Sequence, residues 1–256
     1  MEAPRIVTTS WDDGEQSDLR LADVLRARGM SGTFYVPITP YLGRPALSHV
    51  DLRALHSEGF EIGAHGYSHT HLWKLSQQKL ASEINPCKPV LEDILGAEVR
   101  MFCYPRGRYD SKTIQTLKQA GYLGARTVRM LATGLHFDPF EMPTTVQIRP
   151  HPRMSYFKNI ARGARKFEGI QTLALNMLRL GNWVELGMRL FDFVLANGGI
   201  WHLYGHSQEI EELGLWKDLE RMLDYVANRK GVDYLPNWKL IPAACAPAQH
   251  FEKASA

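Results

Sequence analysis

The amino-acid sequence predicts an α/β protein whose mainly parallel β-sheet is covered by helices. Short runs rich in β-branched and aromatic residues alternate at least five times with segments of helical spacing. The 256 residues suit one large domain, and the 45% hydrophobic and 22% charged residues exclude disordered, collagen-like and coiled-coil chains. We therefore expect a single catalytic domain over residues 1–240 and a flexible tail over residues 241–256.

Local composition and chain-breaking residues place the elements in order. Strands are expected at 5–11, 33–36, 60–64, 100–104, 123–127, 200–204 and 232–235. Helices are expected at 19–28, 49–57, 77–95, 111–120 and 213–229. Glycines follow three of these helices, and Pro86 and Pro89 must interrupt the segment at 77–95. A further amphipathic stripe over 173–195 predicts one long core-facing helix, or two helices joined near Gly181.

The sequence lacks the patterns typical of disulfide-rich, membrane-spanning and secreted proteins. The three cysteines have an odd number and long spacings, so neither a disulfide framework nor a cysteine metal knuckle is expected. No stretch reaches the roughly 18 apolar residues of a membrane span, and the N-terminus lacks a signal-peptide pattern. We expect a cytoplasmic protein with no transmembrane segment, and leave a position at the inner membrane surface open.

Chemistry-bearing side chains cluster where three of the expected strands end. Asp12 and Asp13 follow the first strand, and adjacent carboxylates are costly to keep ionised without a cation or hydrogen bonds. His65 and His69 follow the third strand and are four residues apart, a spacing that lets both reach one ion. His206 ends a later strand, whereas a satisfied core histidine is the favoured interpretation of His202. Ligands in parallel α/β sheets bind at the carboxyl ends of strands, so these clusters predict one site.

Together the clusters contain the parts of a hydrolytic metal site. One carboxylate and two histidines form an open set of three ligands, and a remaining carboxylate and histidine can act as general base and acid. Carboxylate and imidazole ligands suit zinc best, although iron, cobalt or nickel would also bind.

These motifs resemble the polysaccharide deacetylase family, also described as the nodulation-type chitooligosaccharide deacetylase homology domain or carbohydrate esterase family 4. The sequence SWDDG from Ser10 and the sequence HGYSH from His65 match its first two motifs, with Gly66 in place of serine or threonine. The surrounding GTFYVP and FEIGAH are also similar to the family, and the resemblance covers roughly residues 5–235. It implies a distorted (β/α) barrel with about seven parallel strands.

The resemblance also implies roles for individual residues. Asp13, His65 and His69 would hold the metal, Asp12 would be the general base, and His206 would be the general acid that protonates the leaving amine. The reaction would be hydrolysis of an N-acyl amide to a free amine and a carboxylate.

Two motifs depart from the family pattern. Cys103 stands where the family has the arginine that orients the base, and Arg106 stands where an aromatic residue lines the sugar site. Arg106 or Arg108 is one source for the missing cation, and a solvated loop arginine is the alternative. We also expect Tyr104 and Arg106 to contact substrate.

The fourth family motif, an acidic segment followed by tryptophan, is absent. The corresponding sequence from Met142 is MPTTVQIR and has no carboxylate to tune the acid histidine. Glu209 or Glu212 could take that part, or both could be exposed helix residues.

The net charge of +3 is concentrated in one segment. Residues 149–166 contain six Lys and Arg and no Asp or Glu, and without these six the chain has 24 basic against 27 acidic residues. A solvated loop is one interpretation. The other is contact with an anionic substrate group, in which Arg149 and Arg153 take part. A nucleic-acid partner is not expected, because no base-reading motif accompanies the charge.

The sequence therefore predicts a metal-dependent carbohydrate N-deacetylase or deformylase. Its substrate would be an N-acylated amino sugar on a nucleotide or lipid phosphate, in cell-surface glycan synthesis such as lipopolysaccharide biosynthesis. The alternatives are a metal-dependent hydrolase of a non-sugar amide and a catalytically weakened glycan-binding relative. The oligomeric state is left open.

Overall fold

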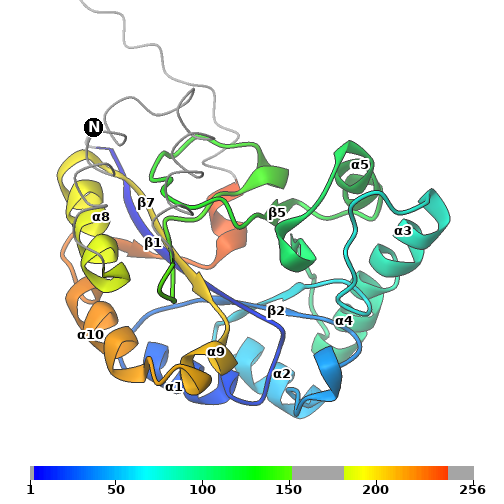
Figure 1. The fold of residues 1–256 in the computed structure, drawn as a ribbon, viewed down its shortest axis with the longest axis horizontal. Helices are drawn as coiled ribbons and strands as arrows, with labels where there is room; N and C mark the ends of the chain where they lie inside the picture. Colours follow the sequence, from blue (N-terminus) through cyan, green and yellow to red (C-terminus); the bar gives the residue numbers. More distant parts are fainter. Residues whose placement is uncertain (1–2, 152–181, 242–256) are drawn as a thin grey trace, which may run out of the picture.

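The computed structural model describes residues 3–151 and 182–241 and contains a curled parallel sheet (Figure 1). Its hydrogen-bonded order is β5-β4-β3-β2-β1-β7-β6, with β8 pairing to β1 outside this path. The strands are β1 (Arg5–Asp12), β2 (Thr33–Val36), β3 (Glu61–Ala64), β4 (Met101–Cys103), β5 (Gly124–Arg126), β6 (Val146–Gln147), β7 (Gly199–Gly205) and β8 (Asp233–Tyr234). Every pairing between these strands is parallel, which confirms the expected distorted barrel.

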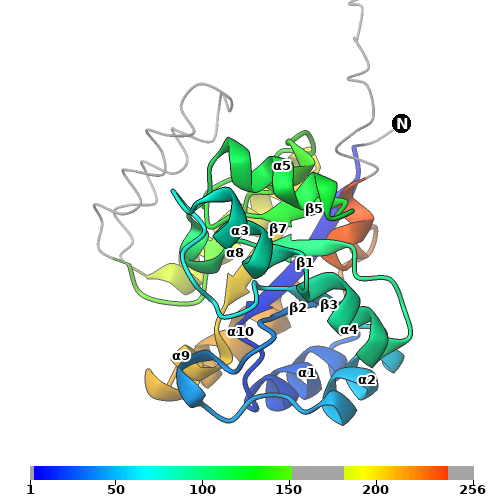
Figure 2. The ribbon, with the colours of Figure 1, turned by 90° about the vertical axis from the view of Figure 1, so that its right-hand side faces the viewer.

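Helices surround this sheet and bury its outer face (Figure 2). They are α1 (Asp18–Arg26), α2 (His49–Ser57), α3 (Gln77–Ile84), α4 (Cys87–Leu95), α5 (Ser111–Gln119), α8 (Trp183–Asn197), α9 (Ser207–Glu212) and α10 (Trp216–Val226). Most of the expected elements are present with boundaries within a few residues. None of the described helices is both long and apolar enough to cross a membrane.

Capping and proline chemistry explain where the helices begin and end. Ser48 accepts a hydrogen bond from the Asp51 backbone N–H, and the Asp51 carboxylate accepts one from Ser48, a capping box that starts α2 at the expected residue. The segment expected at 77–95 divides into α3 and α4 around Pro86, while Pro89 fits in the first turn of α4. Proline there disrupts no intrahelical hydrogen bond.

Two expectations about elements need correction. The helix expected at 213–229 is shorter at both ends, since α10 runs from Trp216 to Val226. Gly214, with a left-handed φ of +65°, lies in the turn between the end of α9 and the start of α10. Strand β6 is not predicted from the sequence, since two residues show no periodicity, but it pairs with β7. The expected helix at 173–195 is described only from residue 182, where Asn182 caps α8.

The longest strand, β1, lies inside the sheet between β2 and β7 and ends at the site. Its Ser10–Asp12 portion pairs with β2, its start pairs with β8, and β7 runs along its full length. The pairing of Trp11 with Gly205 brings Asp12 level with the residue that follows β7, His206. The parallel register therefore gathers the first and last sequence clusters at one edge of the sheet.

Candidate metal and acid–base site

The turn after β1 has an unusual backbone that separates two neighbouring carboxylates. Asp13 has φ of +80° and Gly14 has φ of +61°. A Cβ atom on Gly14 would lie 2.8 Å from Val36 Cγ1, so the turn needs glycine there. Left-handed backbone at a non-glycine residue is strained and often occurs at functional sites. His69, with φ of +55°, shows the same feature.

Asp13, His65 and His69 form a compact group of potential metal ligands. Asp13 Oδ1 lies 3.1 Å from His69 Nε2 and 3.5 Å from His65 Nε2. One potential ligand atom from each residue lies within 4.8 Å of the others. All three residues are buried, and Asp13 Oδ1 has no hydrogen-bond partner among the described residues. Burial by itself raises the pKa of Asp13. Contact with the two imidazoles outweighs this effect and holds the pKa well below its ordinary value.

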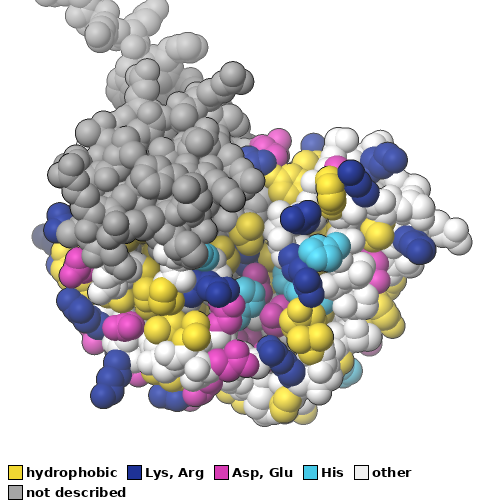
Figure 3. All heavy atoms as spheres, viewed as in Figure 1, with side chains coloured by type: hydrophobic (Ala, Val, Ile, Leu, Met, Phe, Trp, Pro, Cys, Tyr) yellow, Lys and Arg dark blue, Asp and Glu magenta, His cyan; other side chains and the backbone are white. Residues whose placement is uncertain are grey.

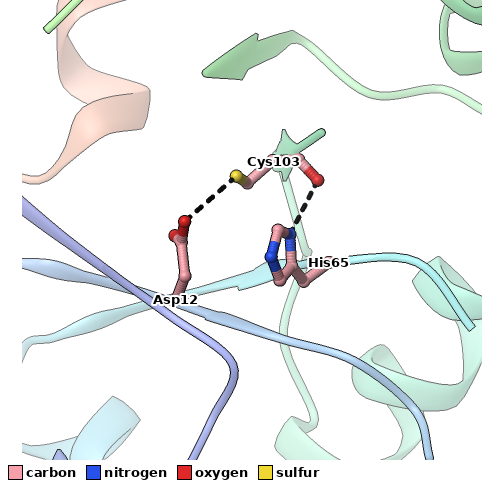
Figure 4. A group of neighbouring side chains, drawn as sticks. All are labelled: Asp12, His65 and Cys103. Atoms are coloured by element: carbon pink, nitrogen blue, oxygen red, sulfur yellow. Dashed lines mark hydrogen bonds between the residues drawn. The ribbon is translucent and has the colours of Figure 1, made fainter. Parts of the chain in front are cut away.

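The contacts around His65 leave one ring nitrogen directed at Asp13. His65 Nδ1 lies 2.9 Å from the Cys103 carbonyl oxygen, which can only accept, so Nδ1 carries the proton (Figure 4). Nε2 then presents its lone pair toward the Asp13 carboxylate. This is how outer-shell contacts orient a ligating histidine. The donor set, the buried unpartnered oxygen and this orientation fit a divalent metal such as zinc.

Asp12 lies beside this group and contacts a buried arginine. Arg126, at the end of β5, forms an ion pair with Asp12 Oδ1 through Nη2. Asp12 Oδ2 faces the Cys103 thiol at 3.7 Å and His206 Nε2 at 3.8 Å. Burial raises the pKa of Asp12, but the charges of Arg126, His65 and His206 outweigh it and lower the pKa below its ordinary value. Asp12 is therefore held as a carboxylate.

The Cys103 side chain is a buried neutral group at this site. Burial raises its thiol pKa above the ordinary value, so the reactive thiolate is disfavoured. Figure 4 shows the thiol and the Asp12 carboxylate pointing toward each other. Cys103 is thus a small buried residue and not a nucleophile.

His206 lies at the mouth of the site between acidic groups. Its Nε2 lies 3.8 Å from Asp12 and 3.9 Å from Asp13, and its Nδ1 lies 3.3 Å from Glu209 Oε2. Burial lowers the pKa of His206, but contact with Glu209 and the two aspartates raises it above the ordinary value. Of the two glutamates considered from the sequence, Glu209 is the one that contacts the histidine.

These residues line one cleft of about 420 Å³. Figure 3 shows histidine and acidic side chains at the centre of a hollow, with Lys and Arg side chains around it. The cleft lining includes Asp12, Asp13, His65, His69 and His206, which the sequence assigned to one site. It also includes Gln147 and Tyr204, which the sequence did not indicate.

The four expected substrate-contact residues lie in different environments. Arg106 lines the cleft and donates a hydrogen bond to the Tyr41 hydroxyl at 3.0 Å. Arg149 forms an ion pair with Glu209 at 2.8 Å, and Arg153 lies outside the described residues. Tyr104 does not line the cleft: it is fully buried and donates its hydroxyl proton to the Phe140 carbonyl. Its position gives no direct route to a substrate in the cleft.

His202 is a satisfied core residue, as expected. It is buried, its Nε2 lies 2.8 Å from the Ser10 hydroxyl and its Nδ1 lies 3.0 Å from the Pro143 carbonyl. Burial lowers the pKa of His202 to about 3, which keeps the ring neutral.

The expected source of the missing cation is wrong. Arg106 and Arg108 lie on the loop after β4, where Arg106 contacts Tyr41 and Arg108 lies over the Trp73 ring. The cation at Asp12 comes instead from Arg126 on the neighbouring strand. A sequence signal did exist, because an arginine within an expected buried strand needs a partner charge.

Comparison with known families identifies the amino-terminal half of the chain. The polysaccharide deacetylase family matches residues 2–125. The YxkH protein of Bacillus subtilis (strain 168), which carries the same family name, is 24% identical over 119 residues, or 46% of this chain and 43% of YxkH. Chitin deacetylase 1 of Cryptococcus neoformans is 28% identical over 113 residues, or 44% of this chain and 23% of that protein. The matches thus span less than half of either relative.

Solved structures extend the likeness of the fold to most of the chain. A family 4 carbohydrate esterase from Streptomyces lividans, in complex with acetate, has a TM-score of 0.56 and 17% identity, covering 90% of this chain and 92% of that one. BA3943 of Bacillus anthracis, a pseudoenzyme of the same esterase family, has a TM-score of 0.57 and 12% identity, covering 94% and 66%. Similarity at this level concerns the fold. The family match therefore covers residues 2–125, and beyond them the likeness to these structures is one of fold.

Proposed function

We propose that this protein is a divalent-metal-dependent hydrolase that removes an acetyl or formyl group from the nitrogen of an amino sugar. One observation carries the proposal: the Asp13, His65 and His69 ligand set lies in one cleft beside a carboxylate and an imidazole suited to acid–base work. A divalent metal held there would supply Lewis-acid polarisation and lower the pKa of a water molecule.

The protonation states of Asp12 and His206 match the parts we assign to them. Asp12, whose pKa is lowered, is ionised and can accept a proton from the attacking water. The raised pKa of His206 favours its protonated form, which can donate a proton to the departing amine nitrogen. Asp12 Oδ2 and His206 Nε2 lie only 3.8 Å apart, so both can reach the same scissile bond.

Basic groups near the cleft support an anionic carrier on the substrate. Arg106 lines the cleft, and Arg149 pairs with Glu209, which also lines it. By sequence, Arg149 begins the segment 149–166 with its six basic residues, and it is the one of the six that the structure describes. Arginine and lysine bind phosphate through charge-assisted hydrogen bonds. We therefore extend the proposal to a nucleotide- or lipid-linked amino sugar used in cell-surface glycan synthesis, handled in the cytoplasm or at the inner membrane surface.

A metal-dependent acyl-release assay tests the proposed function. Metal-depleted protein should release no acetate or formate from phosphate-linked N-acyl amino sugars, and adding back zinc should restore release. Asp12→Asn should lower kcat by at least about 100-fold while retaining the metal, since it removes the general base. Unchanged turnover in that variant would show that Asp12 is not the base.

The two alternatives have separate outcomes in the same assay. Hydrolysis of small non-sugar amides in preference to acylated sugars would favour a non-sugar amidase. Glycan binding without turnover by metal-loaded protein would favour a binding relative, as the fold is shared by an esterase and a pseudoenzyme.

A further inference from the structure

Arg126 is a buried cation at the floor of the proposed site. Its side chain has no exposed surface, and among the described residues its ion-pair partner is Asp12. The Tyr35 and Tyr204 rings lie 5.4 Å and 4.8 Å from its Cζ atom. Its Nε and Nη1 atoms have no hydrogen-bond partner in the described parts of the chain. The guanidinium thus depends on one carboxylate and two aromatic faces for its stabilisation.

The sheet register places Arg126 beside the position that the family motif leaves without a cation. Cys103 at the end of β4 is the cross-strand partner of Arg126 at the end of β5. Both side chains reach Asp12: the guanidinium contacts Oδ1 and the Cys103 thiol lies 3.7 Å from Oδ2. One carboxylate is therefore held between two neighbouring strand ends.

A purely stabilising role is a poor explanation of this pair. A buried ion pair has a desolvation cost that often exceeds its Coulomb gain, particularly when donors remain unpaired. Here two of the guanidinium nitrogens have no hydrogen-bond partner within the described residues. The contact does, however, fix one Asp12 oxygen, so that the other faces His206 at 3.8 Å and the cleft.

We propose that Arg126 is the positioning residue for the base Asp12, and that β5 thereby supplies the cation that the loop after β4 lacks. Cys103 then fills the vacated motif position as a small neutral side chain. This inference rests on the proposed function, because it concerns the same base. It goes further by assigning a part to a residue outside the family motifs.

Exchanging the two cross-strand residues tests the inference. The variants are Arg126→Cys, Arg126→Gln, which retains an N–H donor without the charge, and the double exchange Cys103→Arg with Arg126→Cys. Each is measured for thermal midpoint, bound zinc, kcat and KM with the acylated sugar that the wild type hydrolyses best. Arg129→Gln, at an exposed arginine three residues away, controls for loss of a positive charge.

We expect both single variants to bind zinc and to keep KM within about threefold, while kcat falls by about 100-fold, because a misplaced catalytic group costs roughly that much. The double exchange should recover at least about tenfold of the lost kcat. If Arg126→Cys does not fold, the kcat of Arg126→Gln decides whether Arg126 positions Asp12. Recovery of the thermal midpoint without recovery of kcat in the double exchange would assign Arg126 a structural role and overturn the inference.

Two further outcomes separate this inference from the proposed function. A folded, zinc-loaded Arg126→Gln variant with wild-type kcat would overturn this inference alone. A wild type that hydrolyses no acylated sugar would overturn the proposed function, and this inference with it.

Discussion

His206, the proposed general acid, contacts a residue that lies one helical turn beyond it. Glu209 is the third residue of α9, so its carboxylate returns toward His206 Nδ1 at 3.3 Å. Arg149 holds the other Glu209 oxygen at 2.8 Å. We propose that Glu209 takes the part of the absent acidic motif, and that Arg149 acts on His206 through this carboxylate.

Replacing Glu209 should impair the acid step. We expect Glu209→Gln to lower kcat by about 10- to 100-fold with little change in bound zinc, because the His206 ring loses its orienting anion. Glu211→Gln is the matched control on the same helix, since Glu211 pairs with Arg20 on the exposed surface. Steady-state acyl release measures kcat for both variants. Equal kcat values would contradict the part assigned to Glu209.

At the scale of elements, the start of β3 carries a buried acid that does not line the cleft. Glu61 Oε2 accepts hydrogen bonds from Thr33 Oγ1 at 2.7 Å and from the Trp238 backbone N–H at 3.1 Å. Burial raises the pKa of Glu61 to about 7, despite these hydrogen bonds. The residue joins β2, β3 and the turn after β8, so its protonation affects how these elements pack.

This acid should make stability depend on pH. The unfolded carboxyl has the ordinary pKa of 4.5 and the folded one a pKa of about 7, so the folded state binds more protons between these values. The free energy of unfolding should therefore fall, by up to about 3 kcal/mol, as the pH rises through this window. Stabilisation is complete below the unfolded pKa and is lost as the pH passes the folded pKa.

Denaturant unfolding between about pH 4 and 8 measures this effect. Glu61→Gln should flatten the fall, whereas Glu58→Gln on the exposed surface should keep it. Curves for Glu61→Gln and wild type that run parallel across the window would show that Glu61 does not titrate there.

At the scale of the whole molecule, the parallel sheet brings every expected chemical cluster to one edge. Residues from β1, β3 and β7 are far apart in sequence, yet all follow strands that run in the same direction. Lys and Arg side chains lie around this hollow in Figure 3. Outside residues 149–166 the chain has a slight acidic excess. An anionic carrier on the substrate, as proposed above, would approach this edge of the sheet.

Charge reversal in the basic segment tests that approach. We expect Arg153, Lys158 and Arg162 changed together to Glu to raise KM for a phosphate-linked sugar by roughly tenfold, since each exposed ion pair contributes up to about 1 kcal/mol. KM for an uncharged N-acyl sugar should stay the same, which provides the control. An unchanged KM for the phosphate-linked sugar would remove the anionic carrier from the proposal.

The sequence by itself determined the fold class and the five central residues of the site. Strand and helix periodicities are local, and Asp12, Asp13, His65, His69 and His206 follow strands whose direction a β–α alternation already implies. The short strand β6 was missed because two residues carry no period.

Only the tertiary structure decided which groups support those five. Arg126 reaches Asp12 because β4 and β5 pair in register, a contact between residues 114 positions apart. The same packing buries Tyr104, which the motif comparison had placed at the substrate, and selects Glu209 over Glu212 as the partner of His206. Pattern and spacing specify an element and the face it presents, whereas side-chain partners across a sheet depend on the register between strands, which one element's sequence does not contain.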